Sequence, residues 1–172
     1  MAVTIDGSAS VTTNDGVVLG ITRGTAIAST SGTSIDFTSI PSWVKRITIN
    51  FSGVSTNGTS FLAVQLGAGS ITSSGYSSAG WTTNTNNTNS TTSFVLMAST
   101  AASYVWGGNA TICLLGSNLW TFSSILGYQA ANGMALGAGT VTLGGTLDRV
   151  RITNINGTDT FDAGTINILY EG

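Results

Sequence analysis

Few side chains of this protein could move a proton or hold a metal ion. The chain has seven carboxylates and five Lys or Arg residues, and it has no histidine. Two carboxylates that face each other across a cleft can hydrolyse a glycosidic bond, and Asp159 and Asp162 are the closest candidates in the sequence. Both lie in the turn-rich run 156–164, where aspartate ordinarily accepts hydrogen bonds from the backbone. A turn role is therefore the favoured interpretation, and calcium binding lacks the ligand spacing of an EF-hand.

Other catalytic and metal chemistries lack the residues that they require. Nucleophilic triads and zinc sites depend on histidine or on several cysteines, and Cys113 is the one cysteine of the chain. It lies in the apolar run 112–115, which favours a small core hydrophobe over a reactive thiol. The glycine-rich segments 67–69 and 137–139 lack the lysine of a phosphate-binding loop. We therefore expect no enzyme activity, no catalytic residue, no cofactor and no metal.

Aromatic side chains are the remaining candidates for a binding site. Tyr76, Trp81 and Trp106 lie beside polar or glycine-rich turns. Because an exposed ring next to amides and hydroxyls can stack on a sugar, these three residues are candidate glycan contacts, together with the polar tract 82–92. The alternative, which is favoured for each residue, is that these rings close the end of a hydrophobic core.

Charge and hydropathy exclude two classes of partner. A net charge of -2 and a pI near 4.5 do not suit a run of phosphates, so we expect no nucleic acid. The longest apolar run, 94–98, is far shorter than the roughly 18 residues of a membrane span, so we expect no membrane insertion. The first residues carry no signal-peptide pattern, which predicts synthesis inside the producing cell without secretion.

Apolar residues alternate with polar ones along most of the chain, and this period of two predicts an all-β protein. Ile47, Ile49 and Phe51 should face inward from one strand, and Leu62, Val64 and Leu66 from another. The expected strands are 17–21, 33–37, 43–51 with Pro41 at its start, 61–66, 93–98, 111–116, 119–126, 140–143, 147–153 and 165–170. Turn residues separate them at 14–16, 57–58, 67–69, 107–109, 144–145 and 156–157.

This spacing of short strands predicts an antiparallel β-sandwich of the jelly-roll type. Residues 32–172 should form the sandwich body, residues 1–31 an N-terminal arm or attachment segment, and the tract 82–92 an exposed loop. Ser, Thr, Asn and Gly make up half of the 172 residues, whereas charged residues make up 7%. Since amides, hydroxyls and surplus apolar groups must cover the outside, we expect a sheet face to pack against copies of the chain in a homo-oligomer.

Two segments carry a family resemblance. Residues 32–48 with 53–58, and residues 147–153 with 156–171, are similar to a module that is widespread in tailed bacteriophages, often at the C-terminal end of tail-fibre-like virion proteins. The resemblance covers residues from about 32 to 172, with a far more variable middle. It implies a phage structural protein with a β-sandwich body and trimeric assembly, made in the host cytoplasm and carried on the virion surface.

Three functions remain open at this point. The short arm 1–31 favours a capsid decoration or cement protein that binds itself and other virion proteins, because a fibre protein normally has a long shaft before such a module. The alternative is a tail-fibre or receptor-binding tip that recognises host surface glycan through the tract 82–92 and the aromatic candidates. The third is a glycan-degrading enzyme that uses Asp148, Asp159 or Asp162.

Overall fold

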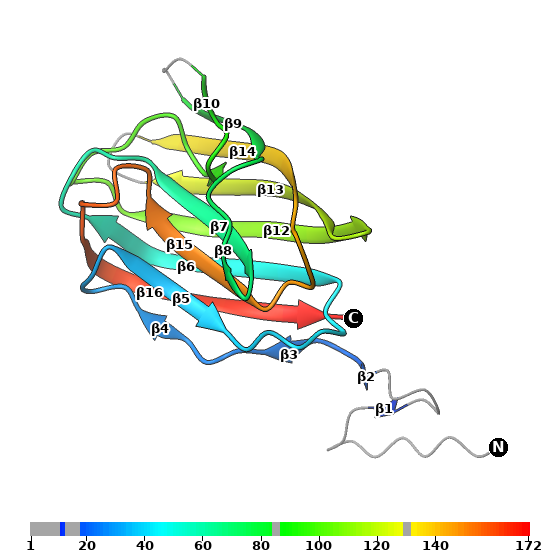
Figure 1. Ribbon diagram of the computed structural model, residues 1–172. Helices are drawn as coiled ribbons and strands as arrows, with labels where there is room; N and C mark the ends of the chain where they lie inside the picture. The colour runs from blue at the N-terminus through cyan, green and yellow to red at the C-terminus, as the bar shows by residue number, and fades with distance from the viewer. Residues whose placement is uncertain (1–10, 13–17, 84–86, 129–131) are drawn as a thin grey trace.

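Every regular element that the structure describes is a β-strand. The computed structural model describes residues 11–12, 18–83, 87–128 and 132–172. Within these residues there is no helix of the length and hydrophobicity that a membrane span requires. Two antiparallel sheets pack face to face, one in front of the other in Figure 1, so the predicted β-sandwich is confirmed.

The larger sheet, called the large sheet below, forms the back layer in Figure 1. Its strands pair in the order β10-β9-β14-β13-β12-β6-β16-β3, and β4 also pairs with β16. The bounds are β3 (Thr22–Arg23), β4 (Ile27–Ala28), β6 (Arg46–Thr56), β9 (Ser77–Thr82), β10 (Thr88–Ser90), β12 (Trp106–Gly116), β13 (Leu119–Tyr128), β14 (Gly133–Thr142) and β16 (Phe161–Glu171).

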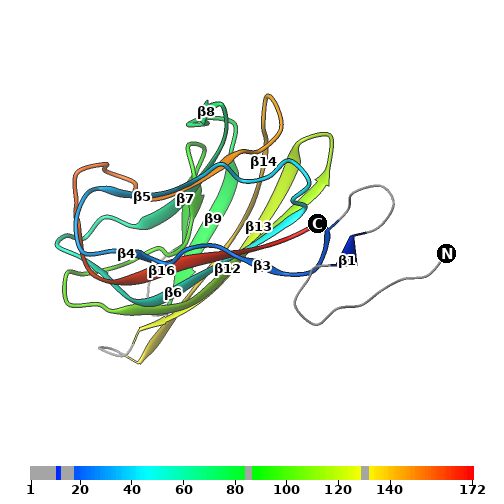
Figure 2. The same ribbon diagram turned by 90° about the horizontal axis from the view of Figure 1, so that it is seen from below.

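The second sheet, called the small sheet, pairs in the order β11-β7-β15-β5, with β8 added beside β7. Its strands are β5 (Ser34–Thr38), β7 (Leu62–Ala68), β8 (Ser70–Ile71), β11 (Phe94–Val95) and β15 (Arg149–Asn154). Figure 2, turned by 90°, shows β5 and β7 in one layer and β4, β16 and β6 in the other. The chain alternates between the sheets from β5 to β7 and again from β14 to β16, whereas β12, β13 and β14 follow one another as a meander.

Residues of the expected N-terminal arm lie along one edge of the sandwich. β3 and β4 pair with β16, and Ser29 donates from its N–H to the Gly164 carbonyl and from its hydroxyl to the Ala163 carbonyl, each at 2.9 Å. β1 (Val11–Thr12) and β2 (Val18–Leu19) pair with each other. Part of the segment 1–31 therefore extends the large sheet, and the turn predicted at 14–16 lies outside the described residues.

Stacked aromatic rings join the two sheets in the core. Phe94 of β11 stacks on Phe122 of β13 with 4.6 Å between ring centroids and 3° between ring planes. Tyr76 meets Phe94 edge-on at 4.9 Å. The inward faces predicted for 47–51 and 62–66 are confirmed, because Ile47, Ile49, Phe51, Leu62, Val64 and Leu66 are all buried.

Small inward residues on β9 and β14 let the segment 93–99 lie directly against the large sheet. Ser78 accepts a hydrogen bond from the Val95 N–H at 3.0 Å and donates to the Ala138 carbonyl at 3.1 Å. Thr82 accepts from the N–H groups of Ala98 and Ser99 at 2.9 and 3.2 Å. These bonds fix the edge of the large sheet from its inner side.

Some local predictions are wrong. Pro41 begins a turn, in which its carbonyl accepts from the Val44 N–H at 3.1 Å, and the strand starts only at Arg46. The tract 82–92 is not one loop, because Thr82 ends β9 and residues 88–90 form β10. β9 itself lies in a region where the sequence predicts no strand.

Two further corrections concern β12. The turn predicted at 107–109 lies inside this strand, at a point where its register with β6 shifts. Gly108, at this point, has a φ of 141°, and any Cβ would collide with the Ile125 carbonyl. Glycine is therefore required here because the backbone of β13 lies so close, and not because the chain turns. Cys113 is half-buried on the outer side of β12, and its neighbour Ile112 faces the core instead, as the alternation along a strand requires.

Candidate binding surface

The carboxylates proposed for catalysis have structural partners. Asp148 accepts two hydrogen bonds from Arg149, at 2.7 and 2.9 Å, and one from the Gly69 N–H at 3.1 Å. The Arg149 hydrogen bonds lower the pKa of Asp148. Asp159 accepts from the Asn156 amide at 2.7 Å and from the Ser60 N–H at 2.8 Å, and these bonds lower its pKa. A general acid needs a raised pKa, so both shifts run against that role.

The positions of these carboxylates also differ from those of a glycosidase pair. Asp148 precedes β15 and Asp159 follows it, so they lie at opposite ends of a strand about 20 Å long, whereas a catalytic pair needs about 5 to 10 Å. Asp159 occupies the predicted turn, but Asp162 is an exposed residue of β16, not a turn residue. The described residues contain no cluster of three or more side chains that could hold a metal.

Of the three aromatic candidates, Trp81 alone has an exposed ring. Tyr76 is 3% exposed; its hydroxyl accepts from the Leu66 N–H at 2.8 Å and donates to the Thr72 carbonyl at 3.1 Å. Trp106 is 1% exposed and donates from Nε1 to the Thr100 hydroxyl at 3.1 Å. The prediction that Tyr76 and Trp106 contact a glycan is therefore wrong, because both rings lie in the core.

Trp81 lies on the outer face of the large sheet. Ser77, Ala79 and Trp81 point outward from β9, because the alternate residues face the segment 93–99. Trp81 is 37% exposed and borders a hollow of about 220 Å³, which is also lined by Ala79, Gly80, Asn87, Leu136, Gly137 and Ala138. An aromatic side chain, an aliphatic side chain and an amide therefore meet in one surface depression.

The register of the large sheet extends this surface into a continuous face. Trp81 pairs with Leu136 and Leu136 with Ile125, so three large apolar side chains stand side by side across β9, β14 and β13. The same row continues through Asn109, Asn50 and Asn167 on β12, β6 and β16. Met134, two residues before Leu136 on the same side of β14, is also exposed. We call Ile125, Met134 and Leu136 the apolar patch.

This face carries no charge. No residue between Arg46 and Asp148 is ionised, and that stretch includes all of β9, β12, β13 and β14. The outer side of these four strands, called the neutral face below, is thus built from apolar, hydroxyl and amide side chains with one tryptophan and the half-buried Cys113. The sequence analysis named only Trp81 among its members; the uncharged stretch between Arg46 and Asp148 is the signal that could have pointed to the others.

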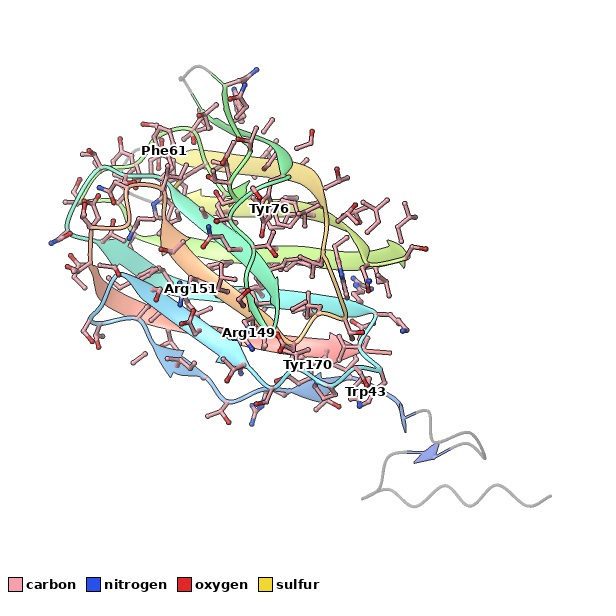
Figure 3. The ribbon with its side chains drawn as sticks, in the orientation of Figure 1. Trp43, Phe61, Tyr76, Arg149, Arg151 and Tyr170 are labelled. Atoms are coloured by element: carbon pink, nitrogen blue, oxygen red, sulfur yellow. The ribbon has the colours of Figure 1, made fainter. Side chains whose placement is uncertain are left out.

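The small sheet has the opposite character on its outer side. Arg149 and Arg151 point away from the core on β15, as Figure 3 shows, while Val150 and Ile152 between and after them are buried. Arg151 makes a bidentate ion pair with Asp36 of β5, with N–O distances of 2.7 and 2.8 Å. The outer side of the small sheet is therefore ion-paired, and the outer side of β9, β12, β13 and β14 is neutral, whereas β6 and β16 of the large sheet carry the Arg46–Glu171 ion pair at 3.6 Å.

Comparisons with known proteins do not assign a function to this surface. No protein-family model matches the sequence, and no curated protein matches it. The crystal structure of the protein of unknown function SO2946 from Shewanella oneidensis MR-1 aligns with 93% of this chain and 80% of its own, at 9% identity and a TM-score of 0.26. Similarity at this level carries no argument, so function has to be argued from the surface itself.

Proposed function

We propose that this protein is a non-enzymatic structural subunit of a tailed-phage virion surface, a capsid decoration or cement protein. In this role it binds other virion proteins and further copies of itself, as a homotrimer. The resemblance of residues 32–48 with 53–58, and of residues 147–153 with 156–171, to a phage module supports the virion assignment. The structural partners of Asp148 and Asp159 support a role without acid or base catalysis.

The neutral face carries the proposal. The side chains of Ile125 and Met134 are 54% and 50% exposed, and Leu136 lies between them at 42%. Contiguous apolar side chains on a surface mark a site of contact with another macromolecule. The centre of a protein interface is depleted in charged residues, because each buried charge loses its hydration. The neutral face meets that requirement without any compensating ion pair.

A single charge placed in the apolar patch tests the contact between copies. We expect the wild-type chain to form an oligomer at micromolar concentration, and Ile125→Asp to shift it to a species near 17.4 kDa. Size-exclusion chromatography with light scattering measures this mass. Thr38→Asp adds the same charge to an exposed position of the small sheet and serves as the matched control, which should leave the oligomer intact.

Two results would contradict the proposal. A wild-type chain that remains monomeric at micromolar concentration removes the contact between copies. Purified particles from the source that contain no copy of the chain, by mass spectrometry and cryo-electron microscopy, remove the virion assignment. Location of the chain on the particle, with its neutral face against a neighbour, is the expected result.

A further inference from the structure

A groove runs along β9 and β14 at the margin of the neutral face. The hollow beside Trp81 is followed by a second one of about 560 Å³, and both share Ala79 and Ala138 as their floor. Asn89, Ser77 and Thr140 line the second hollow. We call the two together the Trp81 groove.

The groove is long, shallow and held in place by the sheet. Trp81 and Ser77 are four residues apart on one strand, so their Cα atoms are separated by about 13 Å. The small side chains of Ala79 and Ala138 face each other in register between these ends and leave the floor low. On the other side of the same strand, Ser78 and Thr82 are bonded to the segment 93–99, which fixes the position of the outward residues.

The outward side chains of the lining are the Trp81 ring, Leu136, two alanines, amides and hydroxyls, and none of them is charged. Ser78 and Phe122 also line the second hollow, but both residues are buried on the inner side of the sheet. Asn87 and Asn89 lie on one margin, and Ser77 and Thr140 form the end opposite Trp81. The row through Thr140 continues over Thr121 and Cys113 and reaches a charged residue only at Arg46. That residue is three strand spacings away, or about 14 Å.

We propose that the Trp81 groove binds an uncharged oligosaccharide. The ring of Trp81 stacks on the apolar face of a sugar, and Asn87, Asn89, Ser77 and Thr140 exchange hydrogen bonds with its hydroxyls. An anionic polymer would find no cation there. An apolar partner would leave the amides and hydroxyls of the groove buried without hydrogen bonds, which is costly, whereas sugar hydroxyls satisfy them.

This site goes beyond the structural role proposed above. Ile125 and Met134 lie outside the groove lining, with Leu136 on the boundary. A neighbouring protein chain can therefore contact the apolar patch while the groove at the β9 and β10 margin holds a glycan. The two proposals share only Leu136, and variants at Trp81 and at Ile125 test them separately.

The test begins with the wild-type protein on an array of oligosaccharides. Neutral trisaccharides of glucose, galactose, mannose and N-acetylhexosamines form one set, and sialylated or uronic-acid-containing oligosaccharides form the other. We expect binding within the neutral set, stronger for trisaccharides than for the matching monosaccharide, since the groove is longer than one ring. No binding to any neutral oligosaccharide at millimolar concentration would overturn the proposal.

Variants then locate the site with the best trisaccharide of the array as the probe. Trp81→Ala should weaken binding more than about tenfold, because the stacking surface is lost, whereas Trp81→Phe keeps an aromatic ring and should lose less than about threefold. Thr38→Ala, at an exposed position of the small sheet that belongs neither to the groove nor to the apolar patch, should bind like the wild type. Unchanged affinity in Trp81→Ala would place the glycan elsewhere and overturn the assignment.

A spectroscopic readout follows the ring itself. Trp106 and Trp120 are buried, at 1% and 2% exposed, and the half-buried Trp43 lies beside Gly172, away from β9. Trp81 should therefore show the largest change when the protein carries 5-fluorotryptophan and the probe is added. Fluorine NMR of the wild type and of Trp81→Phe assigns its signal. An oligomer mass that stays the same in Trp81→Ala separates loss of glycan binding from loss of assembly.

Discussion

The two outer faces of the sandwich differ in the charge of their exposed side chains, although both sheets share one core. The small sheet presents Asp36 and Arg151 as an ion pair with both charges partly exposed. The neutral face presents Ile125, Leu136 and Met134, with no charge on the four strands that carry them. The outer side of the small sheet thus carries exposed charges, whereas the neutral face of the large sheet, where the proposed partner would bind, carries none.

The difference lies in the outward positions, because the central strands of both sheets bury aliphatic side chains on their inward positions. Val150 and Ile152 of β15 are fully buried, and so are Ile47 and Ile49 of β6. Burial of such side chains supplies the main driving force for folding in each layer. If this separation holds, substitutions on the inner side should change stability, and substitutions on the neutral face should change association instead.

The largest expected effect compares two residues of β13 on opposite sides of the large sheet. Phe122→Ala removes the ring that stacks on Phe94 and should lower the free energy of unfolding by about 3 to 5 kcal/mol. Ile125→Ala, on the outer side, should lower the free energy of unfolding by less than about 0.5 kcal/mol when it is measured at a protein concentration low enough for the chain to be monomeric. Urea denaturation measures both, and equal losses would mean that the outer face contributes to the fold as the core does.

Many of the inward residues of the two sheets could be predicted from the sequence. In β6, Ile47, Ile49 and Phe51 alternate with polar residues, and all three are buried. β9 gives no such signal, because its inward residues are Ser78, Gly80 and Thr82. They are small because the backbone of residues 93–99 lies against them, and that contact depends on the tertiary structure, not on local periodicity.

Gly137 tests that close approach on the neighbouring strand. A Cβ at this position would collide with the Val95 carbonyl, and the Ser124 hydroxyl is also close to it. We expect Gly137→Ala to cost roughly 3 kcal/mol, because the neighbour that must move is backbone. Gly145→Ala, where a Cβ has ordinary contact with Ala68 at 3.5 Å, is the matched control and should unfold at nearly the wild-type urea concentration. A stable Gly137→Ala variant would refute the tight packing of β14 on β11.

The burial of Tyr76 between the two sheets can be tested through the pH dependence of stability. Burial raises its pKa from 10.0 to about 12. Between these values the unfolded chain has lost the phenol proton and the folded protein still holds it, so stability is complete below pH 10 and falls as pH rises toward 12. The fall should be on the order of 2 kcal/mol, and Tyr76→Phe should lack this component. Unfolding curves of both proteins from pH 9 to 12 measure it; parallel curves would show that the hydroxyl is not buried.

The candidate binding surface was harder to predict than the core. Trp81 could be named from its polar neighbours, but the same reasoning selected Tyr76 and Trp106, which are buried. Which side of a strand faces water depends on the register and on what covers each sheet. The apolar patch brings together Ile125 and Leu136 from different strands, and their pairing follows from the hairpin of β13 and β14, which local composition does not specify.

The smallest expected effect concerns the ion-paired face. Asp36 and Arg151 are register partners on β5 and β15, and their side chains are 38% and 36% exposed. Because water screens such a pair and two long side chains lose conformational freedom in forming it, the coupling should be below about 1 kcal/mol. A double-mutant cycle with Asp36→Asn and Arg151→Gln, measured by urea denaturation at low and high salt, gives this coupling, which should decrease with salt. A coupling of several kcal/mol that persists at high salt would mean that these charges hold the fold together. The contrast between the faces would then reflect the stability of the small sheet, not its exposure to solvent.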